Sequence, residues 1–402
     1  MSHRGHLSHR VASTSGAVLA LLLAGGAWAQ PESEAPPPNL DFDNPATCAP
    51  CHAAVVAEWT RSMHAQAHHS KDPVYAGLRA VRMAKEGAAV AQGCDTCHAP
   101  RAAGPDDLSP AATNGVSCAT CHTTAHVKAQ GQGAARLVPF EDPKMIQGPN
   151  KARPGMVAPH GLGGDPPPHF VDGMSLCLAC HEQLVSPKGV TLCNTGHEFG
   201  GLGGAFPDQR CIDCHMPIIE GPSGTVDRDQ AHASHSFVGP HHRWTPAEQG
   251  ATPPQPVEVE AAFDGGLLRV VLKNGAGHGW PSGFPARLAL VKLVGLDAGG
   301  QPVWTNFKDD PLAESPESVL NAVFVDAAGK PTLPPFSVAK QRENRLRPGE
   351  ARTVTYAVPA AVKAVKGKVL YRLVPPPAVK LFKLEGLPEA EPRPVIDFEV
   401  AR

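Results

Sequence analysis

The stretch Cys94-Asp95-Thr96-Cys97-His98, followed after nineteen residues by Cys118-Ala119-Thr120-Cys121-His122, decides the fold of this chain. Both pentapeptides read C-x-x-C-H, which is the attachment pattern of c-type haem. On a helix, positions i, i+3 and i+4 share one face. Two thiols can therefore each form a thioether with a haem vinyl group while the adjacent imidazole binds the iron.

The pattern occurs five times and uses ten of the eleven cysteines. A single C-x-x-C can also be a zinc half-site or a redox dithiol. Zinc ribbons use such pairs two at a time, however, and give no reason for a histidine to follow every second cysteine. We therefore expect five c-type haems, with their iron, as cofactors. The expected thioether cysteines are Cys48, Cys51, Cys94, Cys97, Cys118, Cys121, Cys177, Cys180, Cys211 and Cys214, and the expected proximal iron ligands are His52, His98, His122, His181 and His215.

The composition limits the classes of protein to which the chain can belong. Its 402 residues allow two domains of ordinary size once a leader is removed. Aromatic residues make up only 5%, so we expect five porphyrins to supply much of the buried apolar area. The net charge is -2 and the sequence has no basic stripe, which argues against a nucleic-acid partner.

The first residues have the features of an export signal. Met1 to Arg10 is basic, Ala17 to Ala24 is apolar, and Ala27-Trp28-Ala29 fits a cleavage site. Residues 1–29 are therefore expected to be a signal peptide. The apolar run is shorter than the about 20 residues that a membrane span needs. We expect a periplasmic protein without a membrane span, and association with the outer membrane or an extracellular location stays open.

Residues 30–41 are rich in proline and are expected to be a linker. Residues 42–248 hold all five motifs and form the expected pentahaem cytochrome c domain, mainly helical and irregular. A helix is expected to start at Thr47 and to continue past Trp59. If that helix is unbroken, His64 lies about 18 Å beyond His52 and can serve only a neighbouring haem.

Histidine is the expected sixth ligand of each iron, because the sequence holds more than enough of them. Twenty are present, of which five are proximal, three lie in the leader, and His278 is set aside because it lies in the later domain. Eleven remain for at most five distal positions, and the alternative for each is a solvated loop residue. The expected distal ligands are His64, His197 and His235, then His126 and His160, with His169, His241 and His242 in reserve.

From residue 249 to 402 the pattern changes to alternating strands. Val257, Val259, Ala261 and Phe263 alternate with acidic residues, and residues 353–358 and 396–400 alternate in the same way. Short turn segments separate the strands, which indicates an antiparallel β-sandwich that supports the haem domain or docks a partner. The expected fold class is multidomain α+β. Further strands are expected at 267–273, 287–296, 302–308 and 368–374.

Several of these residues resemble the multihaem cytochrome c family that includes the periplasmic tetrahaem carrier of hydroxylamine oxidation. Trp59-Thr60-Arg61-Ser62-Met63-His64-Ala65 is similar to the W-x-x-S-x-H-A run of that family, which implies a distal role for His64. Gly115-Val116-Ser117 and the segment 211–217 also match, and the segment 277–283 looks like one in β domains fused to such cytochromes. The resemblance covers roughly residues 42–300. This chain has five motifs, so the haem order and partner of that family do not carry over.

Electron transfer is the function that these features favour. Two histidines on each iron leave no open coordination site, and such ligation favours low potentials. The expected partners are redox proteins, other cytochromes among them. An oxidoreductase acting on a small nitrogen or sulfur compound at one open haem is the alternative, and the unpaired Cys193 keeps it open. A structural role, in which the β domain binds a partner cytochrome or an outer-membrane conduit, is the third possibility.

Overall fold

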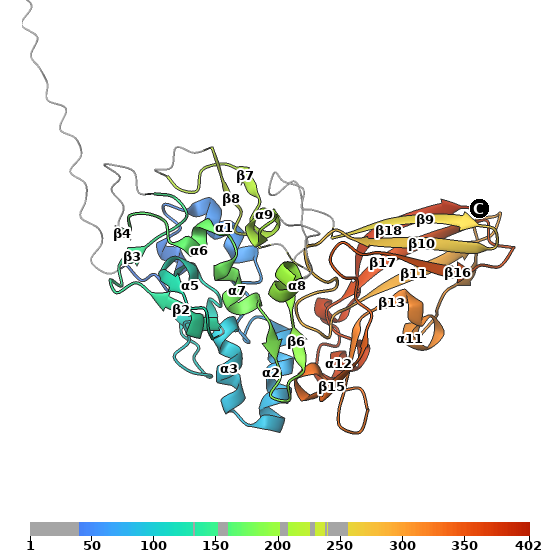
Figure 1. Ribbon diagram of the computed structural model, residues 1–402, viewed down its shortest axis with the longest axis horizontal. Coiled ribbons are helices and arrows are strands. Elements are labelled where there is room, and N and C mark those ends of the chain that lie inside the picture. The colour runs from blue at the N-terminus through green and yellow to red at the C-terminus, as the bar shows by residue number, and fades with distance from the viewer. Residues whose placement is uncertain are drawn as a thin grey trace, which may run out of the picture.

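The computed structural model describes residues 40–131, 133–151, 160–201, 208–225, 230–237, 239 and 256–402. The expected signal peptide, nearly all of the linker, the expected domain boundary at 248 and the reserve histidines His241 and His242 lie outside these residues. Figure 1 shows two parts side by side, a helical part with short strands and a part made of long strands. This is the expected α+β architecture. In the described part of the chain, no helix is both long and apolar enough to cross a membrane.

The helical part consists of short helices joined by loops and two-stranded ribbons. The pairs β1–β2, β5–β6 and β7–β8 are antiparallel, and β3–β4 is parallel. The helices are η1 (Pro45–Thr47), α1 (Ala53–Arg61), α2 (Pro73–Glu86), α3 (Ala89–His98), α4 (Pro110–Thr113), α5 (Cys118–His122), η2 (Gly133–Arg136), α6 (Pro168–Val171), α7 (Ser175–His181), α8 (Thr195–Gly201) and α9 (Cys211–His215). The strands are β1 (Thr124–Val127), β2 (Leu137–Pro139), β3 (Met145–Ile146), β4 (Gly161–Leu162), β5 (Leu184–Val185), β6 (Thr191–Cys193), β7 (Ile218–Glu220) and β8 (Ala231–Ala233).

The prediction of a single helix from Thr47 onward is wrong, because two separate helices begin and end at other residues. The side chain of Asn44 accepts from the backbone of residue 46 and starts η1, which ends at Thr47. A separate helix, α1, begins at Ala53 and ends at Arg61. His64 therefore lies beyond the helix, in the segment that leads to α2.

The long-stranded part is a sandwich of two antiparallel sheets. One sheet has the order β16–β10–β9 and the other the order β12–β11–β17–β18, with β13 paired to β11. The exposure of β9 alternates from Val257 onward, as the sequence predicts. These strands are β9 (Val257–Asp264), β10 (Leu267–Asn274), β11 (Leu288–Leu296), β12 (Pro302–Thr305), β13 (Val319–Leu320), β16 (Ala351–Ala357), β17 (Ala364–Arg372) and β18 (Arg393–Ala401).

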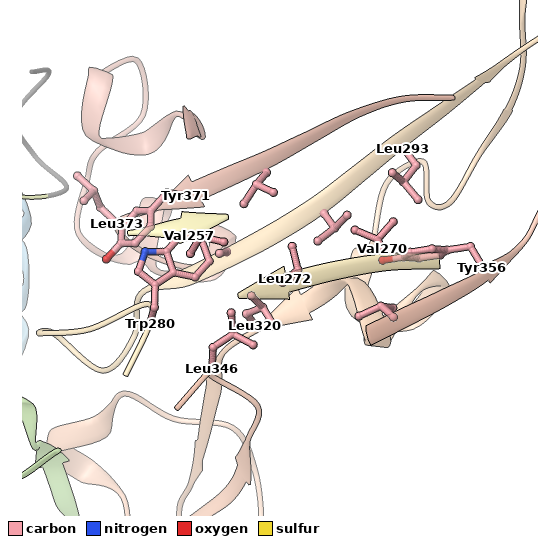
Figure 2. Close-up of a cluster of buried hydrophobic side chains, with 14 of the residues drawn as sticks. Val257, Val270, Leu272, Trp280, Leu293, Leu320, Leu346, Tyr356, Tyr371 and Leu373 are labelled. Carbon is pink, nitrogen blue, oxygen red and sulfur yellow. The ribbon is translucent and has the colours of Figure 1, made fainter. Parts of the chain in front are cut away.

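One hydrophobic cluster fills the space between the two sheets (Figure 2). Val270 and Leu272 of β10 and Leu293 of β11 are fully buried in it. Full burial of a leucine or valine side chain stabilises the fold by about 1.5–3 kcal/mol. The sequence did not reveal the other elements of this part, which are α11 (Pro311–Glu314), η3 (Pro316–Ser318), β14 (Ala322–Val325), η4 (Pro334–Phe336), β15 (Ala339–Glu343), α12 (Pro376–Leu381) and η5 (Pro388–Ala390).

Helix α2 joins the two parts. Asp72 caps it by accepting from the amides of residues 74 and 75, and Pro73 occupies its first turn. Val74 at its start belongs to the hydrophobic cluster of the sandwich. At Gly77 a Cβ atom would lie 2.4 Å from Cβ of Phe382, so only glycine permits this close approach. The two parts thus share a core.

Candidate haem-binding site

The five C-x-x-C-H motifs all form helical turns. Helices α3, α5, α7 and α9 each end at the histidine of a motif. The first motif lies between η1 and α1, where the amide of His52 donates to the carbonyl of Cys48 at 2.8 Å. In every motif the two cysteines and the histidine therefore lie on one face, as thioether and iron ligation require.

Thiols from different motifs lie next to one another. The thiol of Cys48 in the first motif lies next to that of Cys118 in the third. Cys97 of the second contacts a thiol of the fourth, Cys180, and the fourth also contacts the fifth through Cys177 and Cys211. The motifs are therefore packed in one group, although they are far apart in the sequence.

One cavity of about 1900 Å³ runs among these motifs. All ten motif cysteines and all five motif histidines line it. Apolar side chains complete its wall, including Trp59 and Phe170 from the helical part and Trp280 from the sandwich. An apolar space of this size, with thiols and imidazoles on its wall, fits the covalent attachment of large flat macrocycles such as haem.

Hydrogen bonds to carbonyl groups orient the proximal imidazoles. Nδ1 of His52 donates to the carbonyl of Ser223 at 2.8 Å, and Nδ1 of His122 donates to the carbonyl of Gln147 at 2.8 Å. His98 donates in the same way to Ala67 at 3.2 Å. Because Nδ1 carries the proton, Nε2 keeps its lone pair, which is the usual arrangement of a histidine that binds a metal.

Three pairs of histidine rings have nearly the same spacing. The ring centres are 6.3 Å apart for His64 and His181, and 6.2 Å apart for His122 and His235. The third pair is His215 with His278 of the sandwich, and its ring centres are 6.3 Å apart. Two imidazoles bound to one metal at about 2.0 Å each have ring centres about 6.4 Å apart. The three spacings therefore match that of a metal with two imidazole ligands.

Burial keeps the rings of His64 and His181 neutral. Burial, together with the nearby rings of His181, His215 and His235, lowers the pKa of His64 to about 3. Burial likewise lowers the pKa of His181 to about 4. A neutral imidazole is the form that binds a metal. The effect of three other rings on His64 also places the three ring pairs close to one another.

His160 lies near the first motif. It lines the cavity, and its Nδ1 donates to the carbonyl of Gly161, at the start of β4, at 3.3 Å. Burial lowers the pKa of His160, and the ring of His52 contributes to the shift. His160 and His52 therefore face the same region of the cavity.

Two of the expected distal ligands lie elsewhere. His126 is exposed in strand β1, because the helix that carries His122 ends there and the chain turns into an extended ribbon with β2. His197 is exposed on α8. Neither residue lines the cavity.

Two further buried histidines, His232 and His169, also line the cavity. His232 donates from both ring nitrogens, from Nδ1 to Gly221 at 2.7 Å and from Nε2 to Glu58 at 2.9 Å, which leaves no nitrogen for a metal. His169 is buried, and its Nε2 has no hydrogen-bond partner among the described residues. Its ring packs against Phe170, which in turn stacks on His122.

His98 has a different aromatic neighbour from His122, His181 and His215, whose rings each face another histidine. The ring of His98 stacks on Tyr75, with 3.9 Å between the ring centres. The hydroxyl of Tyr75 donates to Asp95 at 2.7 Å, and Arg79 lies 3.6 Å from the same carboxylate.

Cys193, the cysteine outside the five motifs, also lines the cavity. Its thiol contacts the hydroxyl of Thr195 at 3.6 Å.

His278 is the site residue that sequence reasoning missed. It lies on the loop after β10, and its ring is the one that faces His215, with an angle of 15° between the ring planes. The sequence set it aside because it belongs to the strand-rich part. Its position between two glycines, in a segment that resembles β domains of related cytochromes, was the available signal.

The comparisons with known proteins agree with this geometry. The sequence model of the family "Cytochrome c554 and c-prime" matches residues 47–123, which contain the first three motifs. A penta-heme cytochrome c552 from Thermochromatium tepidum has a similar structure, with a TM-score of 0.73 and 25% sequence identity. The match covers 89% of this chain and 98% of that chain. A search of curated proteins finds no match. Together, the family match and the structural match support the interpretation of this chain as a multihaem c-type cytochrome.

Proposed function

We propose that this chain carries five covalently bound haems and transfers electrons between redox partner proteins in the periplasm. The observation that carries the proposal is the single cavity lined by all five motifs, together with histidine pairs at the spacing of two ligands on one metal. The similar protein from Thermochromatium tepidum is a penta-heme cytochrome, which supports the number five. Each haem supplies an iron that accepts and releases one electron.

The residues of this chain hold the haems and set their environment. We assign His64 as the distal partner of His181, His235 as that of His122, and His160 as that of His52. Bis-histidine ligation closes the iron and favours low potentials. The resemblance of the segment 59–65 to a family motif supports the role of His64 independently of the ring spacing.

The first test is the number of haems. The full chain, expressed with its leader in a host that matures c-type cytochromes, should begin at Gln30 and exceed the mass of the processed apoprotein by five haems. Replacing Cys118 and Cys121 by alanine should remove the mass of one haem, whereas replacing Cys193 should remove none. Exported protein without a Soret band, or with the mass of the apoprotein, would refute the proposal.

A second function, that of an oxidoreductase for a small nitrogen or sulfur compound, has one observation in its favour. His98 stacks on Tyr75, whose hydroxyl donates to Asp95 at 2.7 Å, so polar side chains lie beside the second motif. Nearby Asp95 and Arg79 could bind or protonate a small ligand. A high-spin ferric signal that changes with nitrite, hydroxylamine or a sulfur oxyanion would favour this enzyme. A purely low-spin spectrum would favour the carrier.

A further inference from the structure

The loop that carries His278 is built to hold that residue in place. The side chain of Asn274, at the end of β10, is completely buried and donates to the carbonyl of His278 at 2.8 Å and to that of Arg347 at 2.9 Å. The backbone of Trp280 pairs with Leu346 through two hydrogen bonds of 2.9 Å. The core of the sandwich therefore fixes both ends of the loop.

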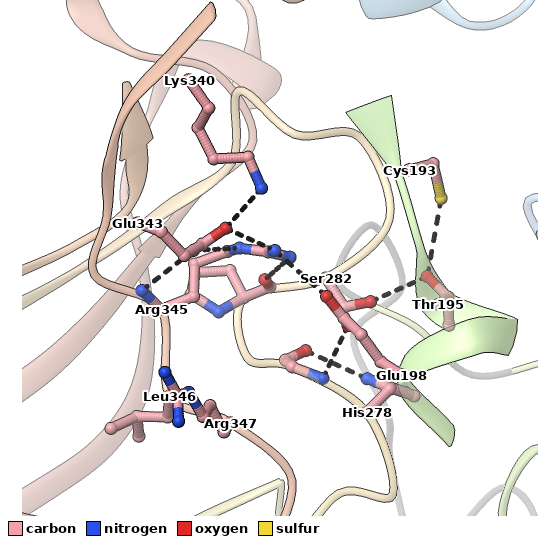
Figure 3. Close-up of polar contacts among 12 residues, drawn as sticks. Cys193, Thr195, Glu198, His278, Ser282, Lys340, Glu343, Arg345, Leu346 and Arg347 are labelled. Atoms are coloured by element: carbon pink, nitrogen blue, oxygen red, sulfur yellow. Dashed lines mark hydrogen bonds and ion pairs between the residues drawn. The ribbon is translucent and has the colours of Figure 1, made fainter. Parts of the chain in front are cut away.

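Helix α8 of the haem part meets this loop directly (Figure 3). The carboxylate of Glu198 accepts from the amide of Gly279 at 2.9 Å and pairs with Arg345 at 3.1 Å. The side chains of Glu198 and Arg345 are each only 12% exposed. At Gly277 a Cβ atom would lie 2.3 Å from the ring of Phe199, so the loop approaches the helix as closely as glycine allows.

The ring of His278 is directed into the cavity. His278 and His215 both line it, with 6.3 Å between their ring centres. Nδ1 of His278 donates to the carbonyl of Gly279 at 3.1 Å, so Nε2 is the nitrogen that remains for a metal. The histidine pairs that lie wholly within the haem part have the same spacing and the same use of Nδ1 at His122 and His235.

We propose that His278 is the sixth ligand of the haem attached at Cys211 and Cys214, so that the sandwich completes the coordination of the fifth iron. The inference rests on the proposed function, because it requires a haem at the fifth motif. It gives the sandwich a role beyond support: one domain holds the macrocycle and the proximal ligand, and the other holds the distal ligand. The coordination of the fifth iron then depends on contact between the domains, which Glu198 and Arg345 maintain.

Replacing His278 by alanine tests this assignment in the full-length holoprotein. The variant should keep all five haems by mass, but its high-spin ferric iron should exceed that of the wild type by one haem per chain. After reduction it should bind one more carbon monoxide per chain than the wild type. The matched control is His197→Ala, which removes an exposed histidine from the neighbouring helix and should leave both measurements unchanged.

A second variant decides the matter if His278→Ala does not accumulate. His278→Met keeps a ligand at this position and should give the absorption band of methionine–iron ligation and raise the potential of one haem. Variants with five haems and the spin state, carbon monoxide binding and potentials of the wild type would overturn the inference alone. A wild-type chain without haems would instead overturn the proposed function.

Discussion

Glu58 of α1 is the residue whose replacement best tests how the distal histidines are held. Its side chain is buried and accepts two hydrogen bonds from the segment that follows β7. One comes from Nε2 of His232 at 2.9 Å, and the other from the backbone amide of His235 at 2.7 Å. Glu58→Ala removes both acceptors and leaves two donors without partners in a buried place.

The expected cost follows from these two bonds. A buried donor without a partner costs about 1–3 kcal/mol, so Glu58→Ala should lower the free energy of opening this segment by about 2–6 kcal/mol. Hydrogen exchange measures that free energy locally. The amide of His235 should exchange at least about 30-fold faster, since about 1.4 kcal/mol corresponds to tenfold. The loosened His235 should also give a fraction of high-spin iron at the third motif.

Glu58→Gln is the matched control, because it keeps the size of the side chain and one oxygen. Its amide group would face the second donor, so the expected loss is about half that of Glu58→Ala, about 1–3 kcal/mol. An amide of His235 that exchanges at the wild-type rate in Glu58→Ala would refute the reasoning. Equal effects of the two substitutions would show that the hydrogen bond retained in Glu58→Gln does not contribute.

Two further predictions concern other parts of the chain. Gly115 has φ +61°, and a Cβ atom there would lie 2.4 Å from the carbonyl of His64, whereas Gly87 has φ +88° and open space. In thermal unfolding, Gly87→Ala should cost about 1–2 kcal/mol and Gly115→Ala about 1–3 kcal/mol more, and equal melting temperatures would contradict this. Burial raises the pKa of Glu343, but the hydrogen bond and charge of Arg345 outweigh it and hold the pKa at about 2, below its ordinary 4.5. Because the folded pKa is lowered, this carboxylate stabilises the fold above pH 4.5 and loses that effect as the pH falls towards about 2, so acid titrations of wild type and Glu343→Gln should converge there. A stability difference that stays constant across this range would contradict the assignment.

Much of the fold could be predicted from local patterns. The spacing within each motif requires a helical turn, and the structure has one at all five places. The alternation beginning at Val257 predicts a strand with one buried face, and β9 follows it. The prediction of one helix from Thr47 was wrong because one helix begins after Asn44 and another begins after His52. The spacing of apolar residues does not reveal such helix boundaries. The elements from α11 to β15 are short and lack a clear period.

The candidate site was less predictable because its partners are far apart in sequence. The sequence suggested His126 and His197 as distal ligands, yet one is on an exposed strand and the other on an exposed helix face. His232 is buried beside the site, but its Nε2 donates a hydrogen bond to Glu58, which is distant in sequence. His278 pairs with His215 only because the sandwich folds back onto α8. Such contacts depend on tertiary structure.

The cavity wall extends from Leu40 near the start of the described chain to Val395 in the last strand. Val74 of the haem part is meanwhile buried in the core of the sandwich. A fragment ending near residue 248 would expose that side chain to water and lack one wall of the chamber. Grafting the sandwich of a relative onto this haem part should therefore succeed only under one condition. The residues that line the cavity and the residues that contact α2 have to be exchanged together with the sandwich. The haem part and the sandwich therefore depend on each other's residues for a complete cavity and a complete core.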